Sequence, residues 1–87
     1  MIHALKTEAP YFDAVIRGAK TFEVRKNDRP FKVGDYLKLN EITGPDKERT
    51  GRFVILRVTY ILDDTRFCKK NYVVIGFQKE FTKGVSQ

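Results

Sequence analysis

The segment from Gly18 to Asp35, GAKTFEVRKNDRPFKVGD, holds the densest mixture of charged, amide, glycine and aromatic residues in the chain. Its first half alternates between apolar and polar residues, as an exposed strand does. Phe22 and Val24 are therefore expected to enter the core, which leaves Glu23 and Arg25 on the opposite, wet face. A carboxylate accepts hydrogen bonds from amines and a guanidinium binds phosphates or base edges. The pattern favours a strand that presents polar side chains to a binding site; the alternative is a solvated face of an edge strand.

The second half of this segment is typical of a loop. Asn27, Asp28 and Arg29 precede Pro30, and a Gly-Asp pair follows at 34–35. Asn and Asp bond their own backbone and Pro fixes φ, so these residues favour turns. We expect a loop that surrounds the site next to the strand.

Two single residues could add chemistry. His3 is the only histidine and could contact a phosphate or a base edge near neutral pH; a partly buried strand histidine is the alternative. Cys68 is the only cysteine, which excludes an intramolecular disulfide and any multi-cysteine zinc or iron–sulfur site. With no recognisable ligand spacing elsewhere, we expect neither a metal nor a cofactor, and a reducing, cytoplasmic compartment fits best.

The composition describes one small basic domain. The chain has 87 residues, a formal net charge of +6 and a hydrophobic fraction of 41%, enough for one core. The positive charge attracts polyanions, of which nucleic acid is the commonest. Without a long apolar run, neither a signal peptide nor a membrane span is expected.

The elements that position these residues follow from periodicity. One short helix is expected between Pro10 and Gly18, with its apolar face formed by Phe12, Val15, Ile16 and Ala19. Besides the strand around Glu23, alternation predicts strands at 2–6, 36–42, 53–62 and 72–77. A polar loop is expected at 43–52, a basic loop at 66–71 and a polar tail at 78–87. The strongest strand pattern places Val54, Leu56, Val58, Tyr60 and Leu62 on one face.

Strands this long in so short a chain predict an α+β fold that is mainly β. We expect a small mixed β-barrel with one short helix after the first strand, because closure removes exposed strand edges.

The run GAKTFEVR, residues 18–25, resembles the Gly-x-Lys-x-x-Glu-x-Arg signature of the ASCH superfamily, whose domains are similar to PUA domains. The resemblance extends over about residues 3–77 and points to a small bacterial and phage branch of that superfamily. The matching segments outside the signature are 3–6, 11–12, 26–29, 31, 34–35 and 50–52. The resemblance implies a PUA-like barrel with a cleft beside the helix that binds RNA or a nucleotide. It would place Lys20, Glu23 and Arg25 in the cleft and Asn27–Arg29 on its rim.

The leading functional hypothesis is therefore an RNA- or nucleotide-binding module. Glu23 would read a cytosine or guanine edge, with Arg25 holding it or contacting the base. Unpaired bases would stack on Tyr11, Phe31 or Tyr36. The side chains expected to neutralise phosphates are Lys20, Lys26, Arg29 and Arg52.

Two alternatives belong to other classes. Some small ASCH proteins are amidohydrolases that act on N4-acetylcytidine with a Lys and a Thr of this motif. Lys20 matches that lysine, but the threonine position is Glu23, so an enzyme would depend on Lys20 with Glu23 as general base. The other alternative is a protein-interaction factor of a phage or mobile element, with exposed Tyr and Phe as anchors.

Overall fold

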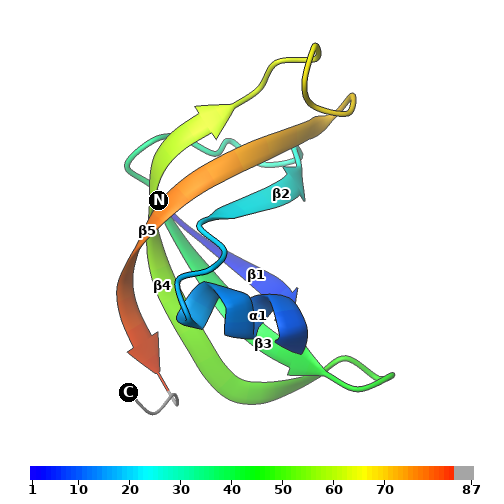
Figure 1. The fold of residues 1–87 in the computed structure, drawn as a ribbon, viewed down its shortest axis with the longest axis vertical. Coiled ribbons are helices and arrows are strands. Elements are labelled where there is room, and N and C mark those ends of the chain that lie inside the picture. The colour runs from blue at the N-terminus through cyan, green and yellow to red at the C-terminus, as the bar shows by residue number, and fades with distance from the viewer. Residues whose placement is uncertain (84–87) are drawn as a thin grey trace.

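The computed structural model describes residues 1–83, which form one helix and a five-stranded sheet (Figure 1). The sheet curls strongly into a half-barrel, and α1 lies against β1 and β3. In chain order the elements are β1 (Ile2–Glu8), α1 (Ala9–Ile16), β2 (Phe22–Lys26), β3 (Tyr36–Thr43), β4 (Glu48–Leu62) and β5 (Tyr72–Lys83). The mainly β architecture with one short helix after the first strand is confirmed.

The strand order is β1-β3-β4-β5-β2. β1 runs parallel to β3, and every other pair is antiparallel. The sheet ends at β1 and β2, so the expected closure by backbone pairing is wrong for the described residues. Side chains span the opening instead: Arg25 Nη2 donates to the Lys6 carbonyl at 2.8 Å, and Arg29 Nη1 donates to the Ala4 carbonyl at 3.3 Å. The opening is the place where a ligand can reach both strands.

The helix has a proline in its first turn and a glycine just beyond its C-terminal end, as expected. Pro10 lies in the first turn, where its missing N–H costs nothing, and Gly18 takes a φ of +78° that reverses the chain. Phe12 and Val15 are buried against the sheet. Ala19, which was expected on the same apolar face, is exposed because the helix has already ended.

β4 crosses the centre of the core. Val54, Leu56 and Val58 are almost fully buried, as the alternation predicted. Tyr60 does not continue this face and is 64% exposed, because the pairing register of β4 with β5 shifts between Val58 and Tyr60. A β-bulge of this kind turns the following side chains to the other side of the sheet.

Two expected irregular segments are largely strand. The predicted loop 43–52 shrinks to a tight turn at residues 44–47, since β4 already begins at Glu48. The predicted tail 78–87 is strand through Lys83, and its residues 84–87 lie outside the described residues. Both stretches pair by backbone hydrogen bonds with a neighbouring strand, and such pairing does not require an apolar face.

The two faces of β2 are the reverse of the prediction. Residues opposite each other in an antiparallel pair point to the same side of the sheet, and Glu23 lies opposite Ile75 of the core. Glu23 is therefore 3% exposed, whereas Phe22 and Val24 are 43% and 54% exposed. The carboxylate faces the interior because two cations accompany it there, which lowers the cost of its burial.

Candidate functional site

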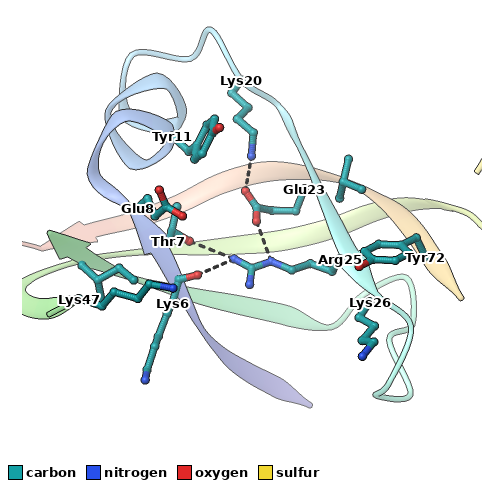
Figure 2. Close-up of a pocket in the computed structure, with 12 residues that line it drawn as sticks. Lys6, Thr7, Glu8, Tyr11, Lys20, Glu23, Arg25, Lys26, Lys47 and Tyr72 are labelled. Carbon is teal, nitrogen blue, oxygen red and sulfur yellow. Dashed lines mark hydrogen bonds and ion pairs between the residues drawn. The ribbon is translucent and has the colours of Figure 1, made fainter. Parts of the chain in front are cut away.

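A pocket of about 700 Å³ occupies the opening between β1 and β2 (Figure 2). Its walls come from four strands, from the helix, and from the loop and the turn that carry Lys20 and Lys47, so no single segment builds it. The lining residues are Lys6, Thr7, Glu8, Tyr11, Lys20, Glu23, Val24, Arg25, Lys26, Ile42, Lys47 and Tyr72. We call this space the Glu23 pocket; its volume lies within the range typical of sites for small molecules.

Glu23 is the most deeply buried charge of the pocket, and each of its oxygens has a basic partner. Lys20 Nζ donates to Oε1, and Arg25 Nε donates to Oε2 at 2.9 Å. The Lys20 ammonium also lies 5.7 Å from the centre of the Tyr11 ring and 5.5 Å from that of Phe22. These contacts fix the carboxylate without a ligand, so an incoming ligand meets an ordered group rather than a mobile side chain.

Arg25 connects the two free strand edges. Besides Glu23 on β2, its guanidinium reaches β1, where Nη2 donates to the Lys6 carbonyl and, at 3.2 Å, to the Thr7 hydroxyl oxygen. Figure 2 shows this chain of contacts from Lys20 through Glu23 and Arg25 to β1. The Arg25 side chain thus links β1 and β2, the two strands on either side of the pocket.

The pocket is electropositive. Five of its lining side chains are Lys or Arg, and two are carboxylates. Lys20 and Arg25 are neutralised by Glu23, whereas Lys6, Lys26 and Lys47 form no ion pair with any side chain in the described part of the chain. Low-dielectric walls around like charges strengthen the attraction for an anion.

Half of the residues that the sequence singled out meet in this pocket. They are Tyr11, Lys20, Glu23, Arg25 and Lys26. The structure thus brings the three charged signature residues together with Tyr11 of the helix.

The three rim candidates lie outside the pocket lining. Asn27 connects its own loop to the loop after β4. Its backbone N–H donates to the Asn71 carbonyl at 2.8 Å, and its Nδ2 donates to Asp63 Oδ2 at 3.4 Å. Arg29 Nη1 donates a hydrogen bond to the Ala4 carbonyl, and Asp28 is exposed. Asn27 and Arg29 stabilise the loops around the pocket, and their role as ligand contacts stays a prediction.

Arg52 is also absent from the pocket lining. It forms a two-pronged ion pair with Glu41, with Nε donating to Oε1 at 2.7 Å, and it stacks 5.2 Å from the centre of the Phe12 ring. This hydrogen bonding by Arg52 holds the pKa of the Glu41 carboxyl below its ordinary value and raises the pKa of Arg52. In this arrangement Arg52 holds the Glu41 carboxylate and does not line the Glu23 pocket.

His3 is a structural residue rather than a pocket residue. It is 3% exposed, its Nε2 lies 2.9 Å from Asp35 Oδ2, and its ring packs at 4.7 Å on Phe31. The hydrogen bond from His3, joined by the Lys32 backbone N–H, lowers the pKa of Asp35. Phe31 packs against His3, and neither residue lines the Glu23 pocket. Neither ring is therefore placed to stack on a base there.

Seven lining residues were not identified from the sequence: Lys6, Thr7, Glu8, Val24, Ile42, Lys47 and Tyr72. For Thr7 a signal existed, because alternation along β1 places it on the buried face of His3 and Leu5. Lys47 and Tyr72 are distant in sequence from the motif, and nothing local indicates that they meet it. Within residues 1–83, no helix has the length and hydropathy needed to cross a membrane.

Comparison with known proteins shows to which family the chain belongs. A protein of Escherichia phage P2 described as "Uncharacterized 12.9 kDa protein in GpA 3'region" is 44% identical over 63 residues, which cover 71% of this chain. Those residues are 55% of the phage protein, so the chain spans about half the length of this relative. The expected phage association thus has a counterpart in a similar protein. Residues 2–77 match the model of a family described as a domain of unknown function, DUF3850, and the chain therefore belongs to the DUF3850 family.

Proposed function

We propose that this protein binds RNA or a nucleotide in the Glu23 pocket. The observation that carries the proposal is a buried, doubly paired carboxylate at the base of an electropositive pocket. Burial of a charge is costly, and a purely structural ion pair does not need a pocket of about 700 Å³ beside it.

Glu23 is the group that reads the base. A carboxylate has about four acceptor positions, and Lys20 and Arg25 use one on each oxygen, so acceptor capacity remains for an exocyclic amine or a ring N–H. Cytosine and guanine present such donors. A carboxylate without a proton is only an acceptor, so Glu23 in that form rejects base edges that offer only acceptors.

The remaining walls suit the sugar–phosphate and the base face. Lys6, Lys26 and Lys47 supply unpaired ammonium groups for phosphates. Tyr11 is 56% exposed and, with Tyr72, offers an aromatic surface at the pocket for stacking. Tyr11 was among the expected stacking groups and Tyr72 was not, whereas Phe31 and Tyr36 do not line this pocket.

The proposal extends to the superfamily. We infer that DUF3850 chains of this kind are ASCH-type domains with a PUA-like barrel. What supports this is the signature run 18–25, whose Lys20, Glu23 and Arg25 meet in one pocket, together with a half-barrel that carries its helix beside that pocket.

The experiment is a binding screen of nucleoside monophosphates and short RNAs by NMR shift mapping at low and moderate salt. Shifts are expected at Lys20–Lys26 and at Lys6, Thr7 and Tyr72, with affinity that falls as salt rises. Glu23→Gln, which keeps the shape but removes the charge, should change the base preference. Diffuse shifts that ignore this substitution would contradict the proposal, since net charge alone would then explain binding.

Hydrolysis of an acylated cytidine is a second candidate, and one observation favours it. The motif lacks the family threonine, yet Thr7 brings a hydroxyl from β1 into the same pocket as Lys20 and Glu23. Acetate release from N4-acetylcytidine that is lost in both Lys20→Met and Thr7→Val would support this candidate. Binding of that nucleoside without acetate release would exclude it.

A further inference from the structure

A second cavity, of about 400 Å³, adjoins the Glu23 pocket on the outer side of β2. Its lining residues are Val24, Phe67, Cys68, Lys69, Tyr72 and Val74. Val24 and Tyr72 line both cavities, so the two spaces share a wall. We call the second space the Phe67 pocket.

The reversed orientation of β2 creates this pocket. With Glu23 and Arg25 turned inward, Val24 lies on the outer face beside Val74, its partner in β5, and is 54% exposed. Phe67 is 72% exposed, which is unusual for a phenyl ring. Exposed apolar groups that gather at a cavity mark a binding surface more often than isolated ones do.

The loop that carries Phe67 is ordered by internal hydrogen bonds. The Asp64 carbonyl accepts from the N–H groups of Phe67 and Cys68 at 2.9 and 2.8 Å, and the Asp64 carboxylate accepts from the Arg66 N–H and guanidinium. Asn71, at a φ of +67°, closes the loop through its carbonyl on Asn27. The backbone of the loop is therefore held in position before any ligand arrives.

The charges around this pocket favour an anion. Lys69 Nζ lies 5.4 Å from the centre of the Tyr72 ring, and no described carboxylate pairs with it. Of the two acids in this loop, Asp64 is paired with Arg66, which lowers the pKa of Asp64, and Asp63 Oδ2 lies 3.4 Å from Asn27 Nδ2. Aromatic rings interleaved with lysines suit a nucleic acid strand, whose bases stack while its phosphates contact the ammonium groups.

We infer that the ligand is a single-stranded RNA of at least two nucleotides, with one base in the Glu23 pocket and its neighbour in the Phe67 pocket. This inference rests on the proposed function and specifies its ligand. Tyr72 and Val24 separate the two bases, and Phe67 stacks on the second one. Lys26, which lies opposite Tyr72 in the β2–β5 pair, and Lys69 contact the connecting phosphates.

Cys68 provides a direct readout, since it is the only cysteine and lines the Phe67 pocket. The rate at which a thiol reagent modifies Cys68 in the full chain is measured alone, with the four nucleoside monophosphates, and with a random RNA hexamer. The hexamer at ten times its Kd should slow the reaction about tenfold, because only about a tenth of the protein then remains free. Monophosphates at the same degree of saturation should leave the rate unchanged.

A matched pair of variants tests the stacking. Phe67→Ala should weaken hexamer binding about tenfold and leave monophosphate binding unchanged. Phe81→Ala is the control, since Phe81 is also exposed but lies near the other end of β5, opposite Ile55. It should alter neither affinity.

The other outcomes separate the two proposals. If both probes bind in a Glu23-dependent way while Cys68 stays fully reactive, the second base site is wrong and the Glu23 pocket remains. If neither probe depends on Glu23, both proposals fall together. If Cys68 becomes protected on raising the protein concentration without RNA, a second copy of the chain covers this face and the inference is overturned.

Discussion

Glu23 and Glu41 are both buried glutamates paired with arginine, yet their surroundings differ. Glu41 is bound on both oxygens by Arg52 and also accepts from the Thr50 hydroxyl at 2.7 Å. Glu23 shares its two oxygens between Lys20 and Arg25, and all three line the Glu23 pocket.

The partners of Glu41 come from the neighbouring strand, whereas those of Glu23 lie two and three residues away in its own segment, at the opening between β1 and β2. Arg52 and Thr50 lie on β4, which pairs with β3, and Arg52 covers the Phe12 ring. Arg25 instead reaches from β2 across to β1. A pair that fills its own space contributes to stability, whereas a pair that borders an empty space can exchange partners with a ligand. Burial and ion pairing alone therefore do not identify a binding site. What distinguishes Glu23 from Glu41 is the pocket beside it.

The largest effect should come from breaking the structural pair. Arg52→Ala leaves Glu41 buried and unpaired and is expected to lower the free energy of unfolding by about 2 kcal/mol; the figure is below that of fully buried pairs because Arg52 is 36% exposed. Urea unfolding measures it. Nucleotide affinity should not change, and a loss of affinity without a loss of stability would make Arg52 a ligand contact after all.

Arg57→Ala is the matched control for this variant. Arg57 also pairs with a glutamate, Glu80, but both side chains are more than a third exposed. Exposed pairs contribute about 0–1 kcal/mol, so this change should be close to neutral.

The pocket pair should show the opposite pattern. Glu23→Gln is expected to weaken binding of the preferred nucleotide about tenfold or more, since hydrogen bonds to a charged group contribute about 1.5–3 kcal/mol. Its unfolding free energy should change less than that of Arg52→Ala, because the Gln amide keeps the shape of the side chain and its oxygen still accepts a hydrogen bond from Lys20 or Arg25. Calorimetric titration and urea unfolding give the two numbers. Equal losses in both would remove the distinction between the two glutamates.

The loss of folding stability at acid pH is expected to depend on Glu41. Its pKa is lowered in the folded protein, first of all by the hydrogen bonds from Arg52, so below pH about 4.5 the unfolded chain binds more protons than the folded one. The stability from this group is present above that pH and is lost as the pH falls through the folded pKa. Glu41→Gln should therefore flatten the fall of unfolding free energy below pH about 4.5. Asp35, whose pKa is lowered by the hydrogen bond from His3, leaves a residual slope in that variant. An unchanged slope would contradict the role of Glu41.

The smallest effect is expected at the outer face of β2. Val24→Ala should change the unfolding free energy by less than about 0.5 kcal/mol, since Val24 is exposed. The same substitution at fully buried Val54 should cost about 2 kcal/mol from lost burial and the cavity left behind. Equal costs at both positions would mean that Val24 is in the core and that β2 has the orientation predicted from its alternation.

Much of the architecture followed from local patterns in the sequence. Alternation located the five strands, Pro10 and Gly18 bounded the helix, and Val54 with its neighbours marked the central strand. These features are set by backbone chemistry and side-chain periodicity within a few residues. Strand ends were less well predicted at 43–52 and 78–83, where pairing with a neighbour extends a polar stretch.

From the sequence by itself, alternation placed Glu23 and Arg25 on one face of a strand, and the resemblance of residues 18–25 to a known signature added Lys20 to them. Only the tertiary structure decided which face of β2 points inward. A period of two defines two faces but does not say which one meets the core, and here two cations made it possible to bury the carboxylate. The structure likewise decided that Thr7, Lys47 and Tyr72 join the pocket while His3 and Arg52 do not. Such encounters depend on strand order and register, which arise from contacts between residues far apart in the chain.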